Sequence, residues 1–174
     1  MITLITGGIK SGKSAHALKM AKMYKKRAFI ATADPGDNSM KEKIAIHQKE
    51  RLDLFFDLVE EKINISDVLS RLHHVYDVVI LDCLTVWLAN LMFVFPEKSE
   101  REMRMSVFIS MLLSLSNHCL IITNETGMGI IPDHKLARDY GEELGLLNRH
   151  VAEISDTVIL MVSGIPVSIK QIRK

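Results

Sequence analysis

The chain has 174 residues, of which 48% are hydrophobic and 25% are charged, a composition typical of a globular domain. The formal net charge is only +1, which excludes a strong overall electric field and disfavours nucleic acid or a membrane surface as the main partner. The length suits one domain, residues 1–174, with a sizeable hydrophobic core.

No segment has the pattern of a membrane span or of a signal peptide. The most hydrophobic window, residues 86–95, is much shorter than the roughly 18 to 20 apolar residues that cross a bilayer. The chain also starts with a strand-like run instead of a charged segment. Cys83 and Cys119 lie in or beside apolar runs without the spacing of a metal site, which predicts buried thiols. We therefore expect a cytoplasmic protein.

Residues 1–14, MITLITGGIKSGKS, combine a strand, a glycine-rich turn and the start of a helix. Residues 2–6 are apolar and β-branched, as in a buried strand. The spacing Gly7-x-x-x-x-Gly12-Lys13-Ser14 is the phosphate-binding P-loop pattern. Glycines allow the positive φ that turns successive N–H groups towards one phosphate, and the helix that follows adds the positive end of its dipole.

The polar residues of this loop have expected roles. We expect Lys13 to lie in an exposed loop, with its ammonium reaching the β and γ phosphates of a nucleotide. The Ser14 hydroxyl should ligate Mg²⁺. The alternative is an ordinary glycine turn between a strand and a helix. We favour the P-loop because strand, loop and helix occur in the required order.

The remaining elements alternate along the chain. Helices are expected at residues 14–26, 40–52, 66–75, 84–93, 99–116 and 136–155, with Gly141 and Gly145 as candidate interruptions of the last one. Strands are expected at residues 28–33, 77–82, 119–123 and 157–162, with an extended piece at 54–60 and a short edge strand at 167–169. This alternation predicts an α/β fold with a mostly parallel sheet and helices on both faces.

Polar residues follow several of the predicted strands. Asp82 ends the run DVVILD, which resembles a Walker B strand whose aspartate holds Mg²⁺ or its waters. Asp34, Asn124 and Glu125 also follow strand ends. Because ligands of parallel sheets bind outside the carboxyl ends of the strands, we expect these residues and the P-loop to line one rim. Asn124 and Glu125 also fit a simple turn, but we favour a place near the substrate.

A second group of chemically active residues lies in the segment MKEKIAIHQKERL. Lys43, His47 and Arg51 recur every four residues, so on a helix they share one face. Such a face suits a triphosphate, and a nearby cation disfavours protonation of His47. A neutral imidazole is a nucleophile that can attack phosphorus. The spacing alone also fits a solvated helix face with an incidental histidine.

The whole chain resembles the bifunctional adenosylcobinamide kinase/adenosylcobinamide-phosphate guanylyltransferase family of cobalamin synthesis. The matching segments are collinear and reach both ends of the chain. They are TGGIKSGKS at 6–14, IATADPGDNSM at 30–40, residues 47–51, LDCLTVWLANLM at 81–92, TNETGMGIIP at 123–132, LAR at 136–138, Leu147-Asn148 and SGIPVSIK at 163–170. The P-loop is shared by many enzymes, whereas IATA with a turn and Met-x₆-His, together with NExGMGIxP, is much more specific.

The resemblance implies a three-layer, RecA-like P-loop NTPase fold, a homotrimer and two reactions. In the first reaction a nucleoside triphosphate, ATP or GTP, phosphorylates the aminopropanol hydroxyl of adenosylcobinamide. In the second, His47 attacks the α-phosphate of GTP and pyrophosphate leaves. Adenosylcobinamide phosphate then takes GMP from the histidine, which gives adenosylcobinamide-GDP.

The resemblance also implies which residues form the site. The catalytic residues are His47 and Lys13, and Mg²⁺ is held by Ser14 and Asp82. The residues implied to bind nucleotide are Gly7, Gly8, Ile9, Lys10, Ser11, Gly12, Lys13, Ser14, Thr32, Ala33, Asp34, Gln48, Lys49, Glu50, Arg51, Glu60 and Asp82. Asn124 and Glu125 are assigned to the substrate side.

The chain departs from the family pattern near the proposed nucleophile. Lys43 stands where the family usually has arginine. Arg51-Leu52 and Phe56 stand where the family often has Arg-Pro followed by tryptophan, so an aromatic residue is kept but the helix end is less defined. These changes bear on relative rates more than on the reaction itself.

Two other functions remain open from the residues alone. One is a P-loop kinase for a small molecule without nucleotidyl transfer, which needs only the first motif. The other is a nucleotide-sensing protein that switches partners on hydrolysis. The remaining histidines lack metal-ligand spacing and are expected at the surface or at helix ends; they are His73, His74, His118, His134 and His150.

Overall fold

The computed structural model describes residues 1–33, 56–129 and 132–171. In these ranges the strands form one seven-stranded sheet in the order β3-β2-β4-β5-β1-β6-β7. The strands are β1 (Ile2–Gly7), β2 (Arg27–Ala31), β3 (Asp57–Glu60), β4 (Val78–Asp82), β5 (His118–Ile122), β6 (Thr157–Val162) and β7 (Ile165–Gln171). All neighbouring strands are parallel except β6 and β7, which form an antiparallel hairpin.

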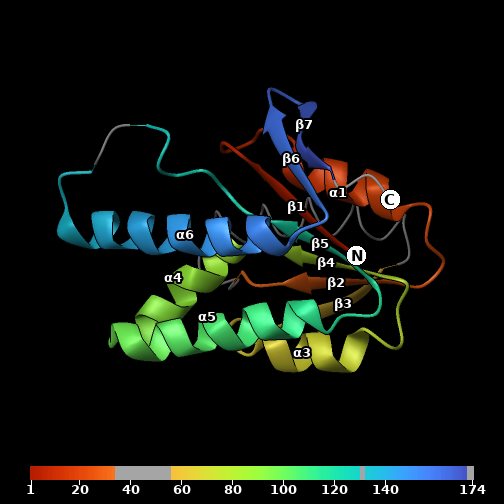
Figure 1. The fold of residues 1–174 in the computed structure, drawn as a ribbon, viewed down its shortest axis with the longest axis horizontal. Helices are drawn as coiled ribbons and strands as arrows, with labels where there is room; N and C mark the ends of the chain where they lie inside the picture. Colours follow the sequence, from red (N-terminus) through yellow and green to blue (C-terminus); the bar gives the residue numbers. More distant parts are fainter. Residues whose placement is uncertain (34–55, 130–131, 172–174) are drawn as a thin grey trace.

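Helices cover both faces of the sheet, and the predicted α/β fold is confirmed (Figure 1). The helices are α1 (Lys13–Ala21), α3 (Ile65–Leu72), α4 (Leu84–Val94), α5 (Lys98–Leu113) and α6 (Lys135–Ile154). Helix α1 packs on one face, and the other four helices pack on the opposite face. The described residues therefore form three layers.

The alternation of side chains along each strand produces two hydrophobic cores. In β4, Val79 and Leu81 belong to the core under α3, α4, α5 and α6, whereas Val78 and Ile80 belong to the core under α1. Successive side chains of a strand point to opposite faces, so a run that is apolar throughout is buried on both sides. This explains why the central strands lack an apolar–polar alternation.

Some predicted boundaries are wrong for reasons that involve distant contacts. Helix α1 ends at Ala21 instead of residue 26. The carboxylate of Asp77 accepts hydrogen bonds from the backbone N–H groups of Lys25 (3.2 Å) and Lys26 (2.9 Å), which draws the chain out of the helix and into β2. Helix α3 also ends earlier than predicted, at Leu72. The predicted helix at residues 40–52 lies outside the described residues.

The C-terminal part of the chain is more regular than predicted. Helix α6 runs unbroken through Gly141 and Gly145, because its apolar face, including Leu144 and Val151, is anchored in the interior. Strand β7 is longer than the predicted strand at 167–169 and pairs with β6 from Ile165 to Gln171, with a register shift between Val158 and Ile159. Pro166 is tolerated because β7 lies at the edge of the sheet.

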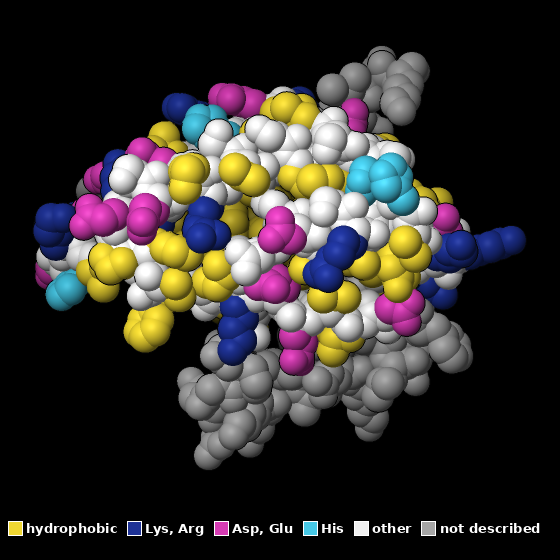
Figure 2. Space-filling view, turned by 90° about the horizontal axis from the view of Figure 1, so that it is seen from below, with side chains coloured by type: hydrophobic (Ala, Val, Ile, Leu, Met, Phe, Trp, Pro, Cys, Tyr) yellow, Lys and Arg dark blue, Asp and Glu magenta, His cyan; other side chains and the backbone are white. Residues whose placement is uncertain are grey.

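The hydrophobic window at residues 86–95 divides between two environments. In α4, Trp87, Leu88 and Leu91 are buried, while Phe93 is 90% exposed. Figure 2 shows hydrophobic side chains scattered among charges of both signs on the face seen from below, without a single-sign patch. Every helix in the described ranges is too short or too polar to span a membrane.

The register of the sheet brings the carboxyl ends of the strands to one edge. Glu60, Ala31, Asp82 and Ile122 are paired in turn across β3, β2, β4 and β5. Strand β1 lies on the other side of β5 and leads directly into the P-loop. The loops that leave these strands therefore share the rim at which a ligand was predicted.

Candidate active site

The P-loop joins β1 to α1 and is held in a shape that requires glycine at two positions. Gly7 has φ +144°, and a Cβ at this residue would lie 2.5 Å from the Met161 carbonyl oxygen. Gly12, with φ +94°, precedes the first turn of α1. The backbone N–H of Gly164 donates to the Ser11 carbonyl (3.0 Å), so the β6–β7 turn braces the loop from outside. Gly8, Ile9 and Lys10 are exposed along the loop.

Lys13 is buried, which contradicts its predicted place in an exposed loop. Its side chain begins in the first turn of α1, and the residue is only 8% exposed. The ammonium Nζ donates to the carbonyl oxygens of Gly8 (2.6 Å) and Gly7 (3.2 Å) and lies 3.5 Å from Ser11 Oγ. Burial lowers the pKa of Lys13, and the neighbouring groups Cys83 and Asp82 oppose that shift. The cation is thus held under the loop by groups that a phosphate can replace.

The first turn of α1 is suited to an anion. Gly12 at its N-cap supplies no side-chain cap, and the turn contains no acidic residue. The N–H groups at the start of a helix, together with the helix dipole, attract negative charge. Loop, helix end and Lys13 therefore combine three sources of positive potential.

Ser14 in α1 and Asp82 at the end of β4 are in direct contact, which agrees with the predicted position of Asp82 beside the P-loop. Ser14 Oγ donates a hydrogen bond of 2.8 Å to Asp82 Oδ2. Hydroxyl and carboxylate oxygens are the donors that Mg²⁺ prefers, and such ions usually complete their shell with water and phosphate oxygens. In the described ranges, no group of three or more histidine, cysteine or acidic side chains is placed to hold a metal ion. The donor set therefore fits Mg²⁺ held by two side chains in the presence of a nucleotide.

Thr32 is buried and braces the rim. Its hydroxyl lies in hydrogen-bond range of two carbonyl oxygens as a donor, those of Cys83 (2.9 Å) and Asp82 (3.1 Å). The same hydroxyl accepts a hydrogen bond from the Cys83 N–H at 2.8 Å. The amide of Asn90 donates to the Thr32 carbonyl (2.8 Å). These contacts join the end of β2 to the end of β4 and fix Asp82. A direct contact between Thr32 and nucleotide stays a prediction, as does one for half-buried Ala33.

Asn124 and Glu125 follow β5 at the same rim. Asn124 donates through its backbone N–H and its side-chain amide to Thr85 Oγ1, both at 3.0 Å. The backbone N–H of Glu125 donates to the Gly7 carbonyl (3.3 Å), and Thr6 Oγ1 donates to Glu125 Oε1 (2.6 Å). Glu125 is therefore tied to the end of β1, where the P-loop begins, by both its backbone and its side chain.

Several supporting residues were missed by the sequence analysis. Thr123 Oγ1 donates to Asn148 Oδ1 (2.7 Å), and Asn148 Nδ2 donates to the Asn124 carbonyl (3.1 Å). The Tyr140 hydroxyl donates to the Thr85 carbonyl (2.9 Å). A detectable signal was present for Asn148, because it is a polar residue on the apolar face of α6.

Other predicted site residues are farther away or lie outside the described ranges. Glu60 is exposed at the end of β3, two strands from Asp82, a separation of roughly 10 Å at ordinary strand spacing. The following predicted residues fall outside the described residues: Asp34, Lys43, His47, Gln48, Lys49, Glu50 and Arg51. Of the predicted site residues, those of the P-loop and the two predicted Mg²⁺ ligands, Ser14 and Asp82, therefore lie together at the rim.

The predicted position of His118 is wrong. This residue is 6% exposed at the start of β5, where Nε2 lies 2.9 Å from Thr3 Oγ1 and Nδ1 lies 2.7 Å from the Tyr24 hydroxyl. Cys119 is buried as predicted, whereas Cys83 is only half-buried, and both are free thiols.

Comparison with known proteins identifies relatives over nearly the whole chain. Residues 3–169 match the family described as cobinamide kinase / cobinamide phosphate guanyltransferase. The bifunctional adenosylcobalamin biosynthesis protein CobP of Pseudomonas aeruginosa is 33% identical over 172 residues, which cover 98% of this chain and 98% of that protein. The bifunctional adenosylcobalamin biosynthesis protein CobU of Escherichia coli K12 is 31% identical over 182 residues, with 98% of this chain and all of that protein (100%) covered.

Solved structures of P-loop ATPase-like proteins share the fold at low identity. A KaiC-like protein, PH0186, from Pyrococcus horikoshii OT3 is 16% identical with a TM-score of 0.52, covering 91% of this chain and 69% of that chain. An ATPase from the type III secretion system of pathogenic bacteria is 11% identical with a TM-score of 0.57, covering 96% of this chain and 56% of that chain.

The full-length family match therefore agrees with the P-loop, the buried lysine and the Ser14–Asp82 pair. It also excludes the two alternatives left open by the motifs, a kinase without nucleotidyl transfer and a nucleotide sensor. The chain belongs to the cobinamide kinase / cobinamide phosphate guanyltransferase family and is a bifunctional kinase and guanylyltransferase of cobalamin biosynthesis.

Proposed function

We propose that the P-loop rim, which is the part of the sheet edge formed by residues 7–14 and Asp82, carries out the first reaction. This reaction is the transfer of the γ-phosphoryl group of a nucleoside triphosphate to the hydroxyl of adenosylcobinamide. The observation that carries this proposal is the 2.8 Å contact of Ser14 with Asp82 beside the buried Lys13 ammonium. Phosphoryl transfer needs little covalent chemistry from a protein, because its loose transition state is stabilised mainly by positioning and charge. The rim supplies both.

Lys13 exchanges partners in this proposal. Its Nζ leaves the Gly7 and Gly8 carbonyls and binds the β and γ phosphate oxygens, where its charge offsets the charge of the leaving group. Phosphate also favours the protonated amine, which counters the lowering of the Lys13 pKa by burial. The α1 N–H groups and the P-loop backbone hold the remaining phosphate oxygens.

Mg²⁺ would be held by Ser14 and Asp82. When bound, the ion supplies charge neutralisation at the phosphate oxygens. Thr32 keeps Asp82 in place through its hydrogen bonds to the Asp82 and Cys83 backbone.

The second reaction is proposed to use His47, which lies outside the described residues. The support is the resemblance and the spacing of His47 with Lys43 and Arg51. An imidazole nitrogen attacks the α-phosphorus of GTP, and the bond to pyrophosphate breaks. A phosphate oxygen of adenosylcobinamide phosphate then attacks the same phosphorus, and the histidine leaves. Two easier displacements replace one difficult step. The further nucleotide contacts implied by the resemblance are those of Asp34, Gln48, Lys49, Glu50, Arg51 and Glu60.

The test is an assay with adenosylcobinamide, ATP, GTP and Mg²⁺ that resolves both products. Wild-type protein should form the phosphate and then adenosylcobinamide-GDP. His47→Asn should accumulate the phosphate and stop there, because its P-loop is intact. GTP alone should leave one GMP on the wild-type chain in a bond that acid cleaves and alkali does not, as expected of a phosphoramidate. Peptide mapping that placed the GMP on another residue, or full guanylyl transfer by His47→Asn, would overturn the assignment.

We also propose a homotrimer, on the strength of the resemblance. Exposed apolar side chains on α4 and on the β6–β7 hairpin support an assembly, because they would gain from burial; Phe93 is 90%, Ile165 66% and Ile169 60% exposed. Light scattering over a range of protein concentrations should give three chain masses. A monomer mass at every concentration would remove this part of the proposal.

A further inference from the structure

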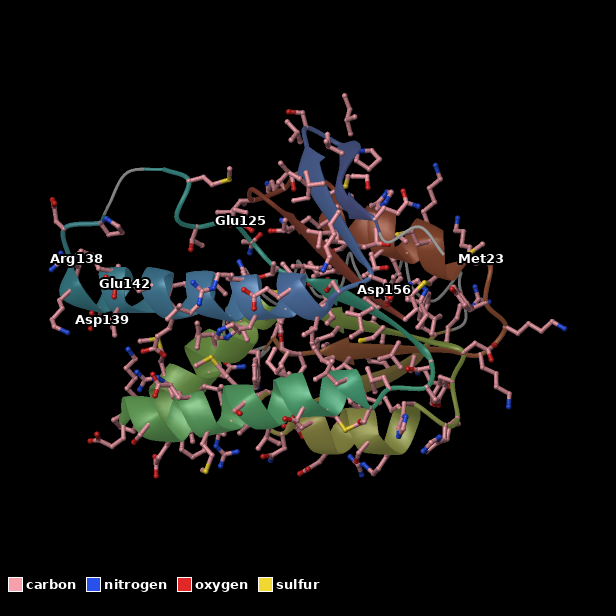
Figure 3. All side chains as sticks on the ribbon, viewed as in Figure 1. Met23, Glu125, Arg138, Asp139, Glu142 and Asp156 are labelled. Carbon is pink, nitrogen blue, oxygen red and sulfur yellow. The ribbon has the colours of Figure 1, made fainter. Side chains whose placement is uncertain are left out.

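Glu125 occupies a central place at the rim that the P-loop motif does not account for. Strand β5 lies between β4, which ends in Asp82, and β1, which leads into the P-loop. Glu125 follows β5 and so leaves the sheet between the two. Figure 3 shows Glu125 on this segment, apart from Asp139 and Glu142, which lie on α6.

One backbone oxygen connects Glu125 to the phosphate-binding lysine. The Gly7 carbonyl accepts the Glu125 N–H at 3.3 Å and the Lys13 ammonium at 3.2 Å. The Glu125 backbone N–H and the Lys13 ammonium share one hydrogen-bond acceptor. The Gly7 peptide therefore places the start of the Glu125 segment next to the site from which Lys13 reaches the phosphates.

The Glu125 carboxylate is oriented by a buried hydroxyl. Thr6 is 3% exposed in β1, and its Oγ1 donates to Glu125 Oε1 at 2.6 Å. Within the described ranges, Oε2 has no hydrogen-bond partner, and Glu125 is half-buried rather than enclosed. One oxygen is thus fixed while the other is available to a ligand at the rim.

The two carboxylates at the centre of the rim differ in their neighbours. Asp82 accepts a hydrogen bond from the Ser14 hydroxyl, and the P-loop pattern predicts that this hydroxyl ligates Mg²⁺. Glu125 receives a hydroxyl from the strand below the loop, and it does not share the Ser14 contact. Pairs of acidic groups in different surroundings commonly divide two tasks of one reaction. Asp82 is the candidate ligand of Mg²⁺. Glu125 is then the candidate group for contact with the hydroxyl that accepts the phosphoryl group.

We propose that Glu125 is the catalytic base of the kinase step and binds the acceptor hydroxyl of cobinamide. This inference rests on the proposed kinase role of the P-loop rim. The hydroxyl proton passes to Glu125 Oε2 as the hydroxyl oxygen forms a bond to the γ-phosphorus. The bond between that phosphorus and the β,γ-bridging oxygen breaks, and its electron pair leaves with the nucleoside diphosphate. The carboxylic acid then returns its proton to water.

Thr6 is a positioning residue in the same proposal. Its hydrogen bond holds Oε1 and leaves Oε2 to accept the hydroxyl proton. Proton transfer requires the base within hydrogen-bond reach of the hydroxyl, so a loose carboxylate should lower the rate more than the affinity for nucleotide.

The test compares both reactions in Glu125→Gln, which keeps the shape but cannot take a proton. With cobinamide, ATP and Mg²⁺, kcat of the kinase should fall about 10² to 10³-fold, while the KM for ATP changes little. Formation of the protein–GMP adduct from GTP should continue, and so should guanylyl transfer to supplied cobinamide phosphate. Kinase activity near that of the wild type would overturn the inference. An equal loss of both reactions would also overturn it, because that result indicates a structural role.

Matched variants separate catalysis from folding. Thr6→Val removes the donor and should lower the kinase kcat by roughly tenfold, whereas Thr6→Ser keeps the donor and should restore it. Glu102→Gln is the surface control, because Glu102 lies on α5 with its side chain 57% exposed in an ion pair that contributes little. It should behave as wild type.

The proposed function and this inference fail in different ways. Lys13→Ala tests the P-loop rim itself. If Lys13→Ala keeps full kinase activity, the rim is not the kinase site and both ideas fail. If Lys13→Ala loses the activity but Glu125→Gln keeps it, the rim stands and only the assignment of Glu125 is wrong.

Discussion

The two ends of the sheet both bury polar side chains, but in different surroundings. At the carboxyl end, Lys13 is 8% exposed, and its ammonium is bound by P-loop carbonyls beside the Ser14–Asp82 pair. At the amino end, His118 is 6% exposed, and each of its ring nitrogens has one side-chain partner, Thr3 or Tyr24. Burial is similar, so burial alone does not distinguish a functional residue.

The difference lies in what can replace the present partners. The Lys13 ammonium faces a loop beside an uncapped helix end, where phosphate oxygens can take the place of the carbonyls. His118 is instead held by Thr3 of β1 and by Tyr24 of the connection between α1 and β2. Burial, together with the N-terminal ammonium, lowers the pKa of His118 to about 4, and Asp156 opposes this shift. We infer that the first group serves chemistry and the second serves stability.

Apart from Lys13→Ala, the largest expected effect comes from Asp82→Asn at the carboxyl end. An amide still accepts the Ser14 hydroxyl but binds Mg²⁺ poorly, so the phosphoryl-transfer rate should fall about 10³-fold. The free energy of unfolding should change by less than about 1 kcal/mol. Rapid-quench kinetics and urea titration measure the two quantities. An Asp82→Asn protein that loses stability but keeps its phosphoryl-transfer rate would show that Asp82 serves stability and not chemistry.

Gly7→Ala tests whether the shape of the P-loop depends on its contact with β6. The added Cβ would lie 2.5 Å from the Met161 carbonyl oxygen at a φ of +144°, so we expect a loss of about 1 to 3 kcal/mol in unfolding free energy. Nucleotide affinity should weaken as well. Gly8→Ala is the matched control, because nothing lies within 4 Å of its added Cβ. Equal stability of the two variants in urea would contradict the expected strain.

His118→Gln tests the amino end through pH. In the unfolded chain His118 takes up a proton near its ordinary pKa of 6.5, but in the folded chain it does so only near 4. The stability contributed by neutral His118 is therefore present above pH 6.5 and is lost as the pH falls towards 4. The wild-type minus variant difference in unfolding free energy should shrink over this window, while kinase activity at pH 7.5 stays close to wild type. A pH-independent difference would refute the assignment.

Tyr24→Phe should have the smallest effect. It removes the hydroxyl that lies 2.7 Å from His118 Nδ1, and a lost buried hydrogen bond costs about 1 kcal/mol. Both reactions should keep their wild-type rates, since Tyr24 is remote from the rim. A large loss of kinase activity would show that the two ends are coupled.

The sequence predicted what depends on local patterns. Apolar runs predicted the central strands, and the Gly7 to Ser14 spacing predicted the loop that joins β1 to α1. The Asp82 partner of Ser14 was also predicted, because both residues follow strands that end at one edge. These features require only the order and the periodicity of the residues.

Contacts between distant residues were not predictable in the same way. His118 and its partners Thr3 and Tyr24 are separated by 115 and 94 residues, so no local pattern reveals that the imidazole is enclosed. The Thr6–Glu125 hydrogen bond joins residues 119 positions apart. The burial of Lys13 was missed because the motif states which residue meets phosphate, but not where its side chain rests beforehand.

The role of Lys13 in the kinase step is tested most directly by single-turnover phosphoryl transfer from labelled ATP to cobinamide by Lys13→Ala. We expect the rate to fall at least about 10³-fold, with a cooperative melting transition retained and Tyr24→Phe at the wild-type rate in the same assay. A folded Lys13→Ala protein that phosphorylates cobinamide at the wild-type rate would contradict this role.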